Sequence, residues 1–315
     1  MDFRTEIKIP NPTFDISYKD ELVMLGSCFT ENIGKKLSGS KFKIDINPFG
    51  ISYNPLSIEN SIRILLEKKQ FTENDLFFHH GVWNNFAHHG SFSDISKGVC
   101  LQKINERINV SSDMLKNANH LIITFGTAWI YELKETKNVV GNCHKLPEKT
   151  FDRRCLSIDE IVETYTNLTH CIRLFNPAIN IIFTVSPVRH WKDGAHENQL
   201  SKSILLLAID KLQQTFPNLH YFPAYEIVMD ELRDYRFYAE DMLHPNNLAI
   251  NYIWEKFSET YFSAETINIQ REVDEISKAE AHKPFNPDTK AHQDFLLKLE
   301  EKKKMLQGKY PFINI

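Results

Sequence analysis

Short apolar runs alternate along the chain with longer segments of helical periodicity. The apolar runs are rich in β-branched and aromatic residues, as in strands buried on both faces of a parallel sheet; they cover residues 22–26, 120–125, 179–185 and 219–223. Helical periodicity covers residues 28–38, 57–69, 157–175, 199–216 and 246–262. The alternation predicts an α/β protein, a three-layer α/β/α sandwich with a mainly parallel sheet.

Two segments depart from this pattern. Residues 75–98 have neither a helical period nor the composition of a linker, and we interpret them as an insertion of loops and short strands. After about residue 264 the sequence is strongly charged, and two amphipathic helices joined by a Pro-rich turn are expected there. We predict a main domain over residues 1–263 and a helical C-terminal extension over residues 264–315, which packs on the main body or serves oligomerisation.

Composition and charge exclude several classes of protein. The chain is 42% hydrophobic, 12% aromatic and 25% charged, which is typical of a globular protein. A net charge of −4 gives no basic surface for nucleic acid. No apolar run is long enough to span a membrane, and the N-terminus lacks the apolar core of a signal peptide. We therefore expect a cytoplasmic protein without nucleic-acid or membrane partners.

The cysteines and histidines give no sign of a metal site. The five cysteines are irregularly spaced and form no C-x-x-C pair, so neither a disulfide framework nor a cysteine zinc site is predicted. His79-His80 and His88-His89 are adjacent pairs, whose side chains would point in opposite directions on a strand. No metal and no cofactor is predicted.

Two motifs carry candidate chemistry. An apolar run ends in Gly26, and Ser27 and Cys28 follow at the start of a predicted helix, where unpaired N–H groups favour a thiolate or an oxyanion. Asp241 precedes His244 by three residues, so its carboxylate can accept the imidazole N–H and leave the second nitrogen to take a proton. Together they predict a nucleophile and its base.

These motifs resemble a known family. Gly26-Ser27-Cys28-Phe29-Thr30, with Asp241-Met242-Leu243-His244-Pro245 far downstream, resembles the SGNH/GDSL hydrolase superfamily and, within it, the signature of the GSCFA family, known mainly from bacteria. Other segments that resemble this family are Phe125 to Trp129, Asn142 to Pro147, Ser186 to His190, Leu200 to Lys202 and Arg233 to Tyr238. The likeness covers about residues 20–262. It implies a flavodoxin-like sandwich of the SGNH hydrolase type and a hydrolase or acyltransferase acting on a small-molecule or carbohydrate acyl ester, or on a thioester.

The resemblance also implies roles for the first motif. When Gly26 is aligned with the glycine of the Gly-Asp-Ser-Leu block, Ser27 falls on the aspartate and Cys28 on the nucleophile. The resemblance therefore implies a triad of Cys28, His244 and Asp241, and Ser27 is the alternative nucleophile. Cys28 is favoured because a thiol is intrinsically the stronger nucleophile. A buried cysteine with a purely structural role is the third interpretation.

The expected oxyanion hole departs from the superfamily. Gly50 matches the glycine of the second block. The third block normally has an asparagine after its glycine, but here Gly126 is followed by Thr127. Thr127, Asn54 and Asn142 are the candidates to replace the missing donor, and the sequence does not choose among them. Loss of one donor costs about 10²–10³ in rate, so a catalytically inactive binding protein on the same scaffold is the alternative function.

Four basic residues are candidates for binding an anionic or polar group of the substrate: Arg189, His190, His144 and Lys202. A surface or structural ion pair explains each of them equally well. Ser201 and Lys202 are neighbours in a predicted helix, where adjacent side chains do not face each other. We therefore do not predict a serine–lysine catalytic pair.

Overall fold

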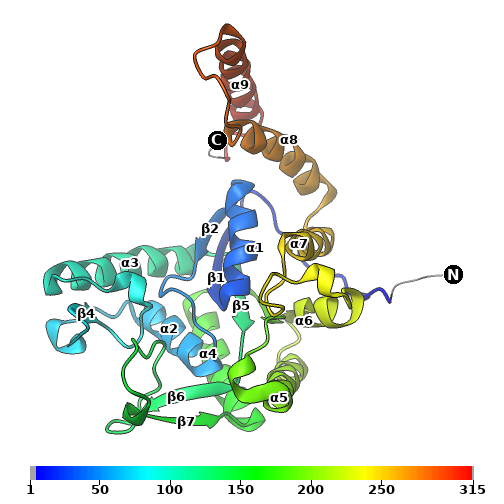
Figure 1. Ribbon diagram of the computed structural model, residues 1–315. Helices are drawn as coiled ribbons and strands as arrows, with labels where there is room; N and C mark the ends of the chain where they lie inside the picture. The colour runs from blue at the N-terminus through cyan, green and yellow to red at the C-terminus, as the bar shows by residue number, and fades with distance from the viewer. Residues whose placement is uncertain (1–4, 314–315) are drawn as a thin grey trace.

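A parallel sheet forms the centre of the computed structural model, which describes residues 5–313. Its five strands are parallel and follow the order β2-β1-β5-β8-β9. They are β1 (Glu21–Gly26), β2 (Lys43–Ile46), β5 (His120–Phe125), β8 (Asn180–Val185) and β9 (Leu219–Phe222). Helices cover both faces of the sheet (Figure 1), which confirms the predicted three-layer sandwich.

Alternate residues of each central strand enter opposite cores. In β1, Val23 and Leu25 face one core, whereas Leu22 and Met24 face the other. Because both faces are apolar, the strand sequences are continuous hydrophobic runs. The first core is covered by α2 (Pro55–Glu67), α3 (Lys97–Asn117), α4 (Ile158–Phe175) and α5 (Gly194–Thr215). The second is covered by α1 (Cys28–Gly39), α6 (Ala224–Glu226), the π-helix η5 (Ile227–Glu231) and α7 (Asn247–Tyr261).

The sequence pattern did not reveal several elements. The edge strand β2 has the sequence Lys-Ile-Asp-Ile, which alternates and is too short to stand out. Helix α3 buries only a narrow stripe that includes Ile104, Ile108 and Leu115. The antiparallel hairpin of β6 (Trp129–Leu133) and β7 (Phe151–Cys155) was not predicted either. The hairpin of β3 (Phe77–His79) and β4 (Val82–Asn84) lies in the segment 75–98, where short strands were expected. The 3₁₀ helices are η1 (Glu73–Asp75), η2 (Gly90–Phe92), η3 (Glu148–Thr150), η4 (Trp191–Asp193) and η6 (Tyr235–Phe237).

Two helices close the chain, α8 (Ala264–Glu280) and α9 (Lys290–Lys309), and they project from the sandwich as a helical hairpin (Figure 1). The first of them is attached to the end of α1. Ser40 Oγ lies 2.7 Å from Asp274 Oδ1, and Ser277 Oγ donates to Gly39 O at 2.9 Å. Ile269 and Val273 extend the second core onto α8. The division of the chain near residue 263 stays a prediction.

Among the described residues, none of the helices combines the length and the apolar character needed to cross a bilayer. Within the same residues, no three His, Cys, Asp or Glu side chains are grouped so that they could hold a metal ion.

Substitution of Gly26 by Ala should disrupt the end of β1. Gly26 has a φ of +148°, and an added Cβ would collide with the backbone oxygen of Thr124 on the adjacent strand. We expect G26A to lower the free energy of unfolding by about 3 kcal/mol or more. Chemical denaturation measures this change.

Gly98 provides the matched control, because it lies in α3 and an added Cβ would meet nothing within 4 Å. G98A should stabilise the protein by up to about 1 kcal/mol, as alanine is the better helix former. Equal stabilities of G26A and the unsubstituted protein would contradict the described packing at Gly26.

Candidate active site

A cavity of about 520 Å³ opens at the carboxyl edge of the sheet. Its walls come from segments that follow four of the strands, together with the loop before α7. The lining residues are Ser27, Cys28, Tyr53, Asn54, Thr127, Trp129, Tyr131, Val140, Gly141, Asn142, Cys143, Arg153, Ser186, Val188, Arg189, His190, Trp191, Lys192, Asp193 and His244. Both candidate nucleophiles and the candidate base therefore line one space.

Ser27 and Cys28 occupy different positions at the start of α1. Ser27 is the N-cap: its Oγ accepts the Phe29 N–H at 3.3 Å, and only 1% of the residue is exposed. Cys28 is the first residue of the helix and is half-buried against the cavity. The hydroxyl of Ser27 is thus engaged in capping, whereas Cys28 is the more exposed of these two lining residues.

The environment of Cys28 favours the neutral thiol. Burial raises the pKa of Cys28, and the N–H groups of Phe29 and Cys28 oppose this shift in part. The nearby charge of Lys202 opposes it as well. Because the net direction is upward, the thiol needs a base to become a thiolate at neutral pH.

Asp241 holds the imidazole of His244. The distance from His244 Nδ1 to Asp241 Oδ2 is 2.5 Å, and Asp241 Oδ1 accepts the N–H groups of His244 and Leu243 at 2.9 Å each. These backbone donors, together with the imidazole, lower the pKa of Asp241 to about 2. An ionised carboxylate at Nδ1 leaves Nε2 as the nitrogen that can accept a proton.

The loop that carries this pair is closed by backbone contacts. Met242 has a φ of +59°, so the turn passes through the left-handed region. Ala239 N donates to His244 O at 2.7 Å, and Asn246 Nδ2 donates to Arg236 O at 2.6 Å. Asn246 is also the N-cap of α7. Within residues 5–313, no hydrogen bond joins Cys28 Sγ to His244, and the two are brought together by the cavity that both line.

The N–H groups of Gly50 and Gly126, the two glycines expected near the oxyanion, already donate hydrogen bonds within the protein. Gly50 N donates to Asn47 O at 2.7 Å, and Gly50 packs against His89 outside the cavity lining. Gly126 N donates to Tyr53 O, also at 2.7 Å. These internal bonds occupy the N–H groups that an oxyanion would need.

The three side chains considered as replacement donors differ in their contacts. Thr127 Oγ1 lies 3.1 Å from Ser201 Oγ and accepts the Trp129 N–H at 3.2 Å. Asn54 is the N-cap of α2: its Oδ1 accepts the Ser57 N–H at 2.8 Å, and its Nδ2 has no hydrogen bond to a described residue. Asn142 Oδ1 accepts the His144 N–H at 2.8 Å. Asn54 and Asn142 thus each offer a carboxamide N–H₂ to the cavity.

Two of the predicted basic residues cannot supply a positive charge to this cavity. His144 is not among its lining residues, and its Nε2 lies 2.9 Å from Asn85 O. His190 lines the cavity, but burial, reinforced by the charge of Lys202, lowers its pKa to about 4. At neutral pH the imidazole of His190 is therefore uncharged.

Lys202 is buried beside the site, a role that sequence analysis missed. It is 1% exposed, and its Nζ donates to Gly126 O at 2.6 Å and to Ser186 O at 2.7 Å. Burial lowers the pKa of Lys202 to about 7. A signal was present in the sequence, because Lys202 shares the buried face of α5 with Asn198, Ser201 and Leu205 at helical spacing.

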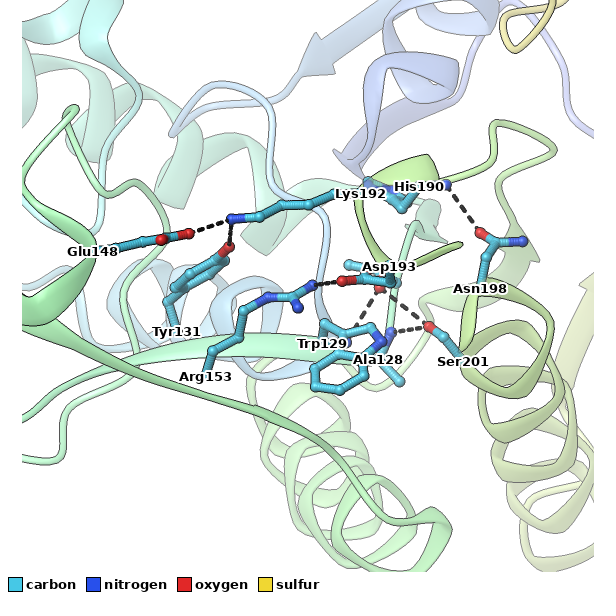
Figure 2. Close-up of polar contacts among 11 residues, drawn as sticks. Ala128, Trp129, Tyr131, Glu148, Arg153, His190, Lys192, Asp193, Asn198 and Ser201 are labelled. Atoms are coloured by element: carbon cyan, nitrogen blue, oxygen red, sulfur yellow. Dashed lines mark hydrogen bonds and ion pairs between the residues drawn. The ribbon is translucent and has the colours of Figure 1, made fainter. Parts of the chain in front are cut away.

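Ion pairs tie the β6–β7 hairpin to η4 along one wall of the cavity (Figure 2). Arg153 lies 2.5 Å from Asp193 and stacks over Trp129. Lys192 donates to Tyr131 Oη at 3.1 Å and to Glu148 at 2.7 Å. The wall therefore combines aromatic faces with charges that are already paired.

The sequence profile of the GSCFA family matches residues 21–257. The chain belongs to the GSCFA family. A second profile, that of the C-terminal domain of GSCFA domain proteins, matches residues 273–315. No curated protein matches the sequence.

Several solved structures show a distant likeness to this GSCFA protein. A Streptococcus pneumonia protein provisionally described as a platelet activating factor is 11% identical, over 76% of this chain and 83% of its own, with a TM-score of 0.38. An acetyl xylan esterase from the rumen bacterium Butyrivibrio proteoclasticus is 9% identical, over 80% and 64% of the two chains, with a TM-score of 0.38. A family 3 carbohydrate esterase from Clostridium thermocellum is 11% identical, over 81% and 98%, with a TM-score of 0.36. Likeness at this level assigns neither substrate nor activity to the GSCFA chain.

Lys202 should make the stability of the protein depend on pH. Its pKa is about 7 in the folded chain and about 10.4 in an unfolded one. Between these values the unfolded state binds the extra proton, so the free energy of unfolding rises with pH by up to about 1.4 kcal/mol per unit. In Lys202→Met this rise should be absent when urea unfolding is compared at pH 7 and pH 9.

Lys211 is the matched control, because it lies on the same helix but is exposed and paired with Asp159. Lys211→Met should keep the rise between pH 7 and pH 9. If Lys202→Met keeps it too, the amine of Lys202 does not titrate as its burial requires.

Proposed function

We propose that this protein is an SGNH-type hydrolase or acyltransferase in which Cys28 attacks an ester or thioester. One observation carries the proposal: the imidazole of His244, oriented by Asp241, lines the same cavity as the thiol of Cys28. The position of Cys28 at the N-terminus of α1 supports the assignment, because unpaired N–H groups there favour a thiolate and an oxyanion.

The reaction has two steps. His244 Nε2 takes the proton of the Cys28 thiol, the sulfur forms a bond to the acyl carbon, and the leaving alcohol or thiol departs with the proton returned by His244. A thioester on Cys28 results. Water or an acceptor hydroxyl then gives its proton to His244 and attacks the thioester, and Cys28 leaves and regains its proton. Asp241, ionised throughout, stabilises the imidazolium that forms in each step.

The oxyanion of both steps would be bound by the N–H of Cys28 and by Asn54 Nδ2. The capping bond to Ser57 fixes the Asn54 side chain through its oxygen and leaves its N–H₂ group unbonded beside the cavity. A donor held in place before the reaction contributes more than one that must first be ordered. Asn54 would thus replace the asparagine that the loop at Gly126 lacks.

The size and walls of the cavity fit a small-molecule or carbohydrate ester. A volume of about 520 Å³ holds an acyl group and a sugar-sized alcohol. Trp129 and Tyr131 supply aromatic faces of the kind on which apolar faces of sugar rings pack. Product analysis in the presence of an acceptor alcohol distinguishes transfer from hydrolysis.

Removal of the Cys28 thiol should abolish turnover. We expect Cys28→Ala to reduce hydrolysis of 4-nitrophenyl acetate by about 10³-fold or more. Ser27→Ala should weaken the cap of α1, costing about 1 kcal/mol of stability, while kcat stays within about tenfold of the unsubstituted value. Initial rates and urea unfolding measure the two effects.

The opposite pattern, loss with Ser27→Ala and retention with Cys28→Ala, would reject the cysteine assignment. Absence of turnover from the unsubstituted protein on simple, carbohydrate and thioester substrates would favour the alternative function, a binding protein on the same scaffold.

The oxyanion assignment can be tested without disturbing the helix cap. Serine is a good N-cap residue, so Asn54→Ser keeps α2 capped but removes the carboxamide donor. We expect kcat to fall by about 10²–10³ with little change in stability. Asn142→Ser is the comparison variant and should leave kcat within about tenfold; the reverse ranking would assign the donor to Asn142.

A further inference from the structure

A second cavity, of about 460 Å³, lies on the other side of the loop that carries the candidate base. Asp241, Met242 and Leu243 line it, whereas His244 lines the first cavity. The two cavities share Arg189 and Trp191 as lining residues.

Every acidic side chain that lines these cavities already has a basic partner. Asp193 pairs with Arg153 at 2.5 Å. Asp234 pairs with Arg236 at 2.8 Å. Asp241 pairs with His244. None of these carboxylates is left to neutralise another cation.

The lysine and arginine side chains that line these cavities are paired as well, with one exception among the described residues. Lys192 binds Glu148 at 2.7 Å, and Arg233 lies 3.4 Å from Asp230. Arg189 has no ion pair with any residue among 5–313. One of its Nη groups lies 3.2 Å from Met229 Sδ, a weak acceptor, and its Nε is buried without a partner. A buried guanidinium N–H without an acceptor is costly unless a ligand provides one.

We propose that Arg189 binds a phosphate or carboxylate group on the alcohol portion of the substrate, in the second cavity. That the bound group belongs to the substrate rests on the proposed function. The planar fork of a guanidinium matches both oxyanions, because each can accept two parallel N–H bonds. An anion there also offsets the repulsion between Arg189 and the buried Lys202, which adds to the effect of burial on the pKa of Lys202.

The position of His244 indicates that the anionic group belongs to the alcohol portion of the ester and not to its acyl portion. In acyl transfer the base returns its proton to the leaving oxygen, so the alcohol lies against the imidazole and continues past it. Beyond His244 the second cavity is bordered by Trp191, 51% exposed, and Tyr235, 75% exposed. Exposed aromatic faces beside a free guanidinium fit a sugar phosphate or an acidic sugar better than an aliphatic alcohol.

The first test measures binding alone, in Cys28→Ala, so that it does not depend on turnover. Inorganic phosphate and acetate are titrated by calorimetry at constant ionic strength. We expect one of the two to bind, and the additional change Arg189→Met to weaken it by about tenfold or more. Arg189→Lys keeps the charge but not the fork and should give an intermediate loss. Arg233→Met, which removes a paired guanidinium from the same cavity, should change affinity by less than about threefold.

Phosphate binding would assign the site to phosphorylated alcohols, and acetate binding to acidic sugars; either supports the proposal. The proposal is wrong if neither anion binds, or if Arg189→Met and Arg189→Lys bind the anion as tightly as their parent protein. This conclusion holds whether or not Cys28 is the nucleophile.

The second test uses the catalytically intact protein with an O-acetylated sugar phosphate and the same acetylated sugar without phosphate. Arg189→Met should raise KM for the anionic ester by about tenfold or more and leave KM for the neutral ester within about threefold. Equal changes for both esters would contradict anion recognition, whereas absence of turnover with both would count against the proposed function and leave the calorimetric result standing.

Discussion

The site depends on one buried amino group, that of Lys202. Lys202 reaches from α5 to two backbone carbonyls, Gly126 O after β5 and Ser186 O after β8. The two strands are neighbours in the sheet, and their following loops would otherwise present unpaired carbonyls to a dry interior. One lysine thus fixes the rim on which the cavity is built. Burying a charge is unfavourable, and the lowered pKa of Lys202 records that cost.

Burial, reinforced by the charge of Lys202, separates the two histidines in the cavity. His190 is mostly buried near Lys202, and its pKa of about 4 keeps it neutral. His244 is nearly half exposed, and its Nδ1 lies against the carboxylate of Asp241. Lys202 also opposes the upward shift that burial imposes on the pKa of Cys28. Exposure and the carboxylate at Nδ1 therefore distinguish the imidazole proposed as the base from the buried one.

Local sequence predicted those parts of the site that short-range geometry determines. The strand, turn and helix around Gly26 and Cys28, and the three-residue spacing of Asp241 and His244, each lie within a few positions along the chain. Gly50 and His144 lie outside the lining of the cavity. The turn with Asn47 occupies the N–H of Gly50, and Asn85 turns the ring of His144 away. Lys202 could be placed on a helix face, but its carbonyl partners come from two distant loops.

The two halves of the candidate site are held with unequal strength. Cys28 is fixed between a central strand and the first turn of α1. Asp241 and His244 lie on an exposed loop that passes through the left-handed region at Met242, and this loop forms the wall between the two cavities. A group bound at Arg189 would pack against the loop as well as against the guanidinium. Because the distance between base and nucleophile depends on that loop, binding in the second cavity would affect the chemical step as well as affinity, so that kcat and KM change together.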